Sequence, residues 1–307
     1  MVVSLSLYSA LAILQPAAHP RAHAPHSALA PDSRRSAPPL SRRAALLGGA
    51  FACPCCAFRP EQVEALTAIT NADGKAAQQF DVPRDKIRDS GFAYGMANGM
   101  AEYERAVAPT KNQLFRQLLS SLPEDEAVVV ELGMGSFPNA EYFNLSDVET
   151  PQRLDIVGID PNDSMQAYAQ RSARRAGLID KGHSVRIVHG VGEALPLRNN
   201  AADAVVCTLT LCSVTEPERV LQEVRRVLKP GGKMLFLEHV LSETDPVLRR
   251  QQELATPLQV AAADGCHLNR RTLQYIEQAG FDSVDGSYFE LSGFNFLNPT
   301  AAGLATA

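Results

Sequence analysis

The chain has 307 residues, of which 45% are hydrophobic and 21% are charged, and its formal net charge is −5. This is the composition of an ordinary globular protein that forms one large domain or two small ones. The negative charge argues against nucleic acid as the main partner, because phosphate binding requires a concentrated basic face.

The N-terminal 60 residues differ in composition from the rest of the chain. They are rich in alanine, serine and proline, and they contain six arginines, no lysine and a single acid, Asp32. An arginine- and serine-rich, acid-poor N-terminus is typical of an organelle transit peptide, and a disordered tail is the alternative. We therefore predict that residues 1–67 are a targeting leader, disordered or cleaved, and that the protein is imported into a plastid (chloroplast).

Two short apolar runs lie inside this leader. Val2–Leu14 resembles the core of a signal peptide and is too short to span a bilayer. Ala44–Phe58 follows Arg42 and Arg43, and an arginine pair before a modest apolar run resembles a twin-arginine export signal. Such a second signal would direct the protein onward to the thylakoid, and a chance pair in an arginine-rich leader is the alternative.

The six cysteines indicate neither a disulfide framework nor a metal site. Three lie in the leader, and no CxxC pair is matched by a second one. The other three, Cys207, Cys212 and Cys266, are far apart in a domain that is large enough to be stable without cross-links. We expect no bound metal.

The rest of the chain divides into a linker and a folded domain. Residues 68–91 are polar and irregular and are predicted to be the linker, and residues 92–307 are predicted to form the domain. Two helices are expected at its start, Gly95–Val107 and Lys111–Leu122, the second with an apolar stripe at 3.6-residue spacing. We expect them to be ordinary packed helices; a lid over a cofactor or a membrane-facing surface is the alternative.

Five short apolar runs then alternate with helical segments. The runs are Ala127–Leu132, Leu154–Asp160, Ser184–His189, Ala202–Leu209 and Lys233–Glu238. The helix after the fourth run is indicated by Pro217 and by a capping box of Thr215 and Glu218. Two more helices and a last strand-like run, Phe281–Leu291, complete the domain. This alternation predicts right-handed βαβ units and a parallel sheet that is covered by helices on both faces.

A glycine-rich loop follows the first run, at the edge of the sheet where parallel strands end and where ligands bind. Gly133 and Gly135 let the backbone pass close to a ligand. Such a loop also serves dinucleotides, but Glu131 immediately before it would repel a pyrophosphate and would favour a cofactor with a cationic amino acid part. A plain tight turn is the alternative.

Further polar residues follow the second and third runs. Asp160 ends the second run, and an acid there can accept hydrogen bonds from both hydroxyls of a ribose. Its alternative role is a helix cap, which Asn162 or Asp163 can already supply. Gly192 and Glu193 follow the third run, where an adenine ring would lie.

These segments, in this order, resemble the class I S-adenosylmethionine-dependent methyltransferases. The most specific matches are residues 159–162 (IDPN), 207–214 (CTLTLCSV), 223–232 (EVRRVLKPGG), 238–240 (EHV) and 264–268 (DGCHL). They are similar to the methyltransferase-like thiol S-methyltransferases and their plastid relatives, and more broadly to the methyltransferase type 11 group, over roughly residues 92–307. The resemblance implies an α/β, Rossmann-like fold with a mostly parallel seven-stranded sheet and helices on both faces.

The resemblance also implies a cofactor, S-adenosylmethionine, and a role for each matching residue. Glu131, Gly133 and Gly135 would line its methionine part, Asp160 its ribose, and Gly192 with Glu193 its adenine. Thr208 would also contact the cofactor, and Thr208–Leu211 would border the acceptor pocket. The chain departs from the family at Phe137, where members usually have a third glycine and where a bulky residue is expected to narrow the loop. It also has Val191 where many members have an acid, and it has no tryptophan.

Methyl transfer from a sulfonium is a displacement in which the protein mainly aligns the acceptor and excludes water. A thiol acceptor has a pKa of about 8.5, so it needs only a modest base. We take His239 as the first candidate base and His267, next to Asp264 and Cys266, as the second; a structural histidine is the alternative.

Three functions follow as hypotheses. The leading one is a methyltransferase that acts on a small molecule, as an S- or O-methyltransferase, with a thiol as the first candidate acceptor. The second is a C-methyltransferase of a prenylated quinone, and the third is a cofactor-binding protein without catalysis. We expect a small-molecule acceptor as partner and no nucleic acid, and peripheral contact with a membrane is an open alternative.

Overall fold

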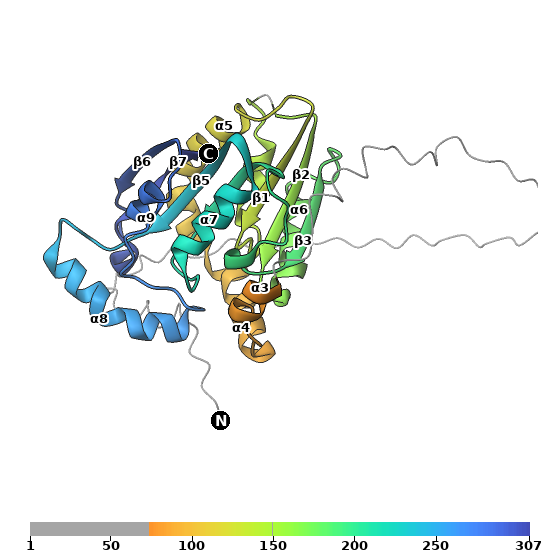
Figure 1. Ribbon diagram of the computed structural model, residues 1–307. Helices are drawn as coiled ribbons and strands as arrows, with labels where there is room; N and C mark the ends of the chain where they lie inside the picture. Colours follow the sequence, from red (N-terminus) through yellow and green to blue (C-terminus); the bar gives the residue numbers. More distant parts are fainter. Residues whose placement is uncertain (1–73, 149) are drawn as a thin grey trace, which may run out of the picture.

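The computed structural model describes residues 74–148 and 150–307, so the predicted leader lies outside the described residues. Seven strands form one sheet in the order β3-β2-β1-β4-β5-β7-β6, with helices on both sides (Figure 1). The strands are β1 (Glu126–Leu132), β2 (Arg153–Asp160), β3 (Ser184–His189), β4 (Ala202–Thr208), β5 (Leu228–His239), β6 (Ser283–Phe289) and β7 (Thr300–Thr306). Strands β1 to β5 are parallel, and β7 runs antiparallel to both of its neighbours, β5 and β6.

The central strands β1, β2 and β4 are buried on both faces, and their successive side chains point to opposite sides of the sheet. Val130 faces a cluster that holds the apolar stripe of α7 (Pro217–Val227), and the next helix on this face is α9 (Thr272–Gln278). Val129 faces a second cluster, built from α5 (Ala101–Leu119) and α6 (Gln166–Arg175). The predicted Rossmann-like, mostly parallel seven-stranded sheet is therefore confirmed.

The N-terminal helices differ from the prediction. The segment interpreted as a linker holds α3 (Gly74–Phe80) and the start of α4 (Lys86–Gly99), which begins at Asp85, whose side chain accepts hydrogen bonds from two backbone N–H groups. The break between helices falls at Met100, and α5 continues through Pro109. A proline inside a helix costs roughly 3 kcal/mol, and α5 tolerates it because its apolar stripe is buried over several turns.

The start of α7 also differs from the prediction. The predicted capping box at Thr215 is absent: α7 begins after Glu216, without a side-chain cap of its own. The backbone N–H groups of Thr215 and Glu216 donate instead to the carboxylate of Glu193, 2.7 and 3.2 Å away. A carboxylate at the positive end of a helix replaces the local cap.

Phe137 stands in the left-handed region of backbone conformation, with φ 59°, where glycine is usually found. Its side chain is buried and packs against Phe143, with the ring centroids 5.8 Å apart. The ring therefore lies in the core beneath the glycine-rich loop and does not narrow the loop, contrary to the prediction. Burial of the ring compensates for the strained backbone.

We expect the substitution Phe137→Gly to lower the free energy of unfolding by about 1–4 kcal/mol. Removing a large buried ring costs about 3–5 kcal/mol, and release from the left-handed conformation returns about 1–2 kcal/mol. Urea unfolding followed by circular dichroism measures the difference. A glycine variant as stable as the wild type or more stable would contradict this, because the strain released would then match or exceed the packing lost.

Candidate active site

A cavity of about 650 Å³ opens at the carboxyl ends of the parallel strands, between the sheet and the N-terminal helices. The strand loops supply one wall: residues 132–136, 159–161, 190–193, 208–210 and 213–215. The segment 80–85 and α4 supply the facing wall. This volume is within the range of sites that bury a small organic ligand.

Both glycines of the loop adopt left-handed backbone conformations, and Gly133 also has no room for a side chain. Gly133 has φ +57°, and a Cβ there would lie 2.5 Å from Oγ1 of Thr210. Gly135 has φ +55°, and its backbone N–H donates to Oδ2 of Asp160 over 2.8 Å. Both predicted glycines line the cavity, and they bring the bare backbone to its surface, as a closely bound ligand requires.

Asp160 joins the loops that follow β1 and β2. Oδ2 accepts the hydrogen bond from Gly135, and Oδ1 accepts one of 2.8 Å from the backbone of Asn162. Burial raises the pKa of Asp160, while the two backbone hydrogen bonds and Arg84 act against this shift. The carboxylate lines the cavity. Asn162, and not Asp160, caps the helical turn that follows.

Glu131 is buried just before the glycine-rich loop and does not itself line the cavity. Its Oε1 accepts a 3.0 Å hydrogen bond from Nδ2 of Asn139, which also donates to Oγ1 of Thr208 at the cavity wall. Burial raises the pKa of Glu131 to about 8, against the effects of Asn139 and Lys111. Oε2 of Glu131 and Oδ1 of Asn139 have no hydrogen-bond partner among the described residues. Two orphaned acceptors in a buried position fit a donor that a ligand supplies.

Lys111 is a cavity residue that the sequence reasoning missed. Its side chain is 1% exposed, and Nζ forms an ion pair with Glu104 over 2.7 Å. Lys111 lies between Val107 and Leu114 on the buried stripe of α5. A lysine within an apolar stripe is the sequence signal by which it could have been found. With Glu131, it places a positive and a negative group near the same part of the cavity, as a zwitterionic ligand requires.

Gly192 and Glu193 line the cavity in the short helical turn after β3. A Cβ at Gly192 would lie 3.1 Å from the side chain of Val220 in α7. Both oxygens of a carboxylate can accept hydrogen bonds, but Oε1 of Glu193 is already engaged by the start of α7. Its contacts with α7 thus fix this turn, which is where the sequence predicts the adenine ring.

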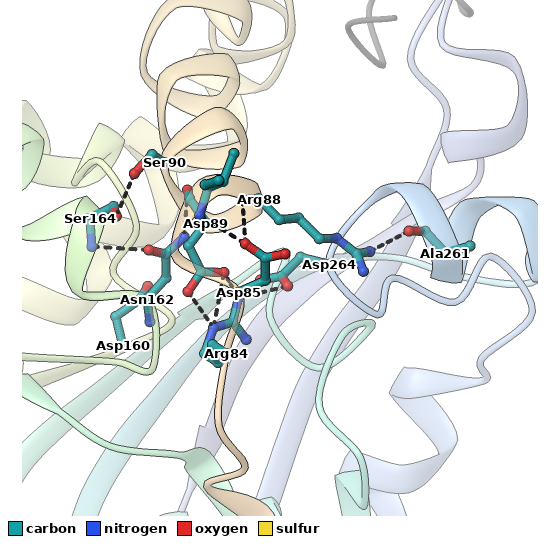
Figure 2. Close-up of polar contacts among 11 residues, drawn as sticks. Arg84, Asp85, Arg88, Asp89, Ser90, Asp160, Asn162, Ser164, Ala261 and Asp264 are labelled. Atoms are coloured by element: carbon teal, nitrogen blue, oxygen red, sulfur yellow. Dashed lines mark hydrogen bonds and ion pairs between the residues drawn. The ribbon is translucent and has the colours of Figure 1, made fainter. Parts of the chain in front are cut away.

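A polar network holds the N-terminal segment over the cavity (Figure 2). Arg84 reaches Asp89 in α4 and Asp264 after α8 (Pro246–Ala262), each with a shortest distance of 2.8 Å from Nη2. His189 contacts Asp81 at 3.1 Å and also Asp163. These contacts join a segment that looked like a linker to the ends of β3 and α8.

Neither candidate base lines the cavity. His239 is 2% exposed, and its Nε2 lies 3.1 Å from Sγ of Cys266. His267 is half-buried, its Nδ1 lies 2.7 Å from the carbonyl oxygen of Gly265, and its backbone N–H donates to Cys212. The catalytic roles of the two histidines stay predictions.

Comparisons with known proteins bear on this site. A family model described as a methyltransferase domain matches residues 130–236. Thiol S-methyltransferase TMT1B of Rattus norvegicus is 34% identical over 197 residues, which cover 63% of this chain and 76% of that protein. The chain belongs to the class I S-adenosylmethionine-dependent methyltransferases. It is an enzyme of that class, and the hypothesis of a protein without catalysis is set aside.

Two further similarities are weaker. Ubiquinone/menaquinone biosynthesis C-methyltransferase UbiE of Citrobacter koseri is 31% identical to the methyltransferase over 157 residues, which cover 45% of this chain and 60% of that protein. A chain from the complex of the Haloferax volcanii Trm112 methyltransferase activator is 18% identical with a TM-score of 0.50, and the match covers 74% of this chain and 99% of that one. The second similarity concerns the fold alone.

The cofactor of the methyltransferase is S-adenosylmethionine, and the described residues fit it. The loop of Gly133 and Gly135 would admit the chain of the cofactor, and Asp160 would accept its ribose hydroxyls. Lys111 would meet the carboxylate group of its methionine part, and Glu131 lies buried just behind the same part of the wall. When bound, the cofactor supplies a methyl group that is already activated on a sulfonium.

We expect the stability of the cofactor-free enzyme to fall between pH 6 and pH 7.5, relative to that of the variant Glu131→Gln. The pKa of Glu131 is about 8 in the folded chain and near its ordinary 4.5 in the unfolded chain. Between these values the folded state holds the extra proton, so stability is lost as the pH rises. The expected loss is about 1–2 kcal/mol. Chemical unfolding at several pH values measures it, and parallel pH profiles for the two proteins would show that Glu131 does not titrate in this way.

Proposed function

We propose that the methyltransferase transfers the methyl group to the sulfur of a small apolar thiol. The apolar wall of the cavity carries this proposal. Phe92 and Met96 of α4, and Met100 at its end, line the same cavity as the glycine-rich loop. An acceptor beside these side chains would meet an aromatic ring and polarisable thioethers, which suit an apolar, sulfur-containing molecule.

The ionisable groups of the cavity support a thiol over an alcohol. Among the described residues that line it there is no histidine and no cysteine, and its acids and bases are mostly held in ion pairs or backbone hydrogen bonds. A thiol ionises near pH 8.5 and therefore needs little help from a base. The name of the rat relative, a thiol S-methyltransferase, agrees with this choice.

A C-methyltransferase of a prenylated quinone is the second candidate. The same apolar wall and the absence of a histidine from the described lining also suit a quinone ring. The partial similarity to the UbiE enzyme supports this alternative over less than half of the chain. The longer match to the thiol S-methyltransferase favours the thiol.

Peripheral contact with a membrane is a further part of the proposal. Ile87 and Tyr94 on α4, and Leu254 and Leu258 on α8, are each more than 60% exposed. Contacts of Arg84 and Arg88 with the end of α8 bring these two helices together beside the cavity (Figures 1 and 2). Exposed apolar side chains on neighbouring helices support contact with an apolar surface. Within residues 74–148 and 150–307, no helix combines the length and the hydrophobicity that crossing a membrane requires.

An acceptor panel tests the proposed function. We expect the full chain, supplied with methyl-labelled S-adenosylmethionine, to methylate small alkyl and aryl thiols and to ignore the matched alcohols. The rate should rise with pH up to the pKa of the thiol, because the thiolate is the nucleophile. The variant Met96→Glu should lower kcat/KM for an apolar thiol by about tenfold or more through the lost apolar contact, while its affinity for the cofactor stays near that of the wild type.

Two outcomes would contradict the thiol proposal. Methylation of a prenylated quinol and not of thiols would establish the second candidate. Equal kcat/KM values for Met96→Glu and the wild type on an apolar thiol would show that the apolar wall does not contact the acceptor. The conservative variant Met96→Leu is the matched control, and it should keep activity close to that of the wild type.

A further inference from the structure

Three side chains outside the cofactor cavity meet behind its wall. Cys212 lies in the loop after β4, His239 ends β5, and Cys266 follows α8. One potential ligand atom from each lies within 4.8 Å of the others, and the side chains are 2%, 2% and 8% exposed. We propose that Cys212, His239 and Cys266 bind a zinc ion.

The backbone holds Cys212 in this position. The buried carboxylate of Glu238 accepts hydrogen bonds from the backbone N–H groups of Thr210, Leu211 and Cys212, at 2.8, 3.1 and 3.3 Å. The loop after β4 is therefore fixed to the end of β5, which also carries His239. A site whose ligands are preset in this way loses little conformational entropy when a metal binds.

Cys266 is brought to the same place by its own segment. The backbone N–H of His267 donates to the carbonyl oxygen of Cys212 over 2.8 Å. Gly265 has φ +85°, and a Cβ there would lie 2.8 Å from the carbonyl oxygen of Ser213. Glycine therefore permits the close approach of the two segments, and this approach places the two sulfurs beside one imidazole.

The donor set and its spacing suit zinc. Zinc binds thiolate sulfur at about 2.3 Å and imidazole nitrogen at about 2.0–2.1 Å in a tetrahedron, which sets sulfur and nitrogen about 3.6 Å apart and the two sulfurs about 3.8 Å apart. Nε2 of His239 lies 3.1 Å from Sγ of Cys266, and all three ligand atoms lie within 4.8 Å. Two thiolates neutralise a divalent cation in this dry place, and the sulfur-rich set excludes Mg²⁺ and Ca²⁺.

Nε2 of His239 faces Cys266 and would be the nitrogen that binds zinc. Nδ1 of the same ring is buried and has no hydrogen-bond partner among the described residues. Three protein ligands leave one position of a tetrahedral ion to water or to another ligand. Ser213 and Gly265, the chain neighbours of the two cysteines, line the cavity, so the ion would fix that part of its wall.

Metal content tests this proposal directly and independently of the acceptor. The protein is the full chain with the leader cysteines replaced, so that their thiols do not bind metal; the replacements are Cys53→Ser, Cys55→Ser and Cys56→Ser. After treatment with a chelator and reloading with Zn²⁺, we expect one zinc ion per chain by atomic emission. The further double variant Cys212→Ser, Cys266→Ser should retain less than about a tenth of that amount.

The matched control is Cys207→Ser, which removes a third buried thiol that contacts Glu238 but lies outside the cluster. It should keep one zinc ion. Cobalt in place of zinc should give a sulfur-to-metal charge-transfer band in the control and none in the double variant. If the double variant does not fold, competition with a chromophoric chelator measures zinc affinity on the parent protein alone. Less than about a tenth of an ion per chain, or binding weaker than about 10 μM, would overturn the proposal.

Discussion

Buried carboxylates hold together the loops at the carboxyl edge of the sheet. Asp160, after β2, accepts a hydrogen bond from the loop after β1, and Glu238, at the end of β5, accepts three from the loop after β4. Glu193, after β3, accepts two from the start of α7. A buried carboxylate must be hydrogen-bonded, and bonds from backbone N–H groups to an ionised acceptor are among the strong ones. The loops that surround the cavity therefore have little freedom, and the cavity keeps its shape.

This arrangement also sets the charge of the site. Acids outnumber bases among the described residues that line the cavity: Asp81, Asp85, Asp89, Glu104, Asp160, Glu193 and Asp264 stand against Arg84, Arg88 and Lys111. A surplus of negative charge attracts a cofactor that carries a sulfonium and an ammonium group. Arg84 and Lys111 each pair with acids at 2.7–2.8 Å. These two cations hold the neighbouring acids in place, while the net charge of the lining stays negative. Arg84, Arg88 and the contact of His189 with Asp81 together hold the N-terminal segment over the cavity.

The parts of this structure that the sequence predicted are those with local signals. Short apolar runs predicted β1 to β5, and glycines before polar residues marked the edge where the cofactor belongs. Strand β7 (Thr300–Thr306) was missed because its small residues carry no β-branched pattern; Gly303 is needed there, since a Cβ would clash with the backbone of Asp285. Residues 81–89 looked like a linker because their polar side chains pair with partners far away in the chain, as Arg84 does with Asp264. The cluster of Cys212, His239 and Cys266 has no sequence signal, because its members are 27 residues apart and belong to different elements.

The cofactor site depends most directly on Asp160, which lines the cavity and also fixes Gly135. Titration of S-adenosylmethionine into the full chain by calorimetry, with Asp160→Asn and Asp160→Ala as variants, measures that dependence. We expect binding near micromolar for the wild type, and a loss of about tenfold or more in both variants, because neither side chain provides two charged acceptors for ribose hydroxyls. Equal affinity in the wild type and in folded variants, or no binding by the wild type, would contradict the placement of the cofactor at the carboxyl edge of β1 and β2.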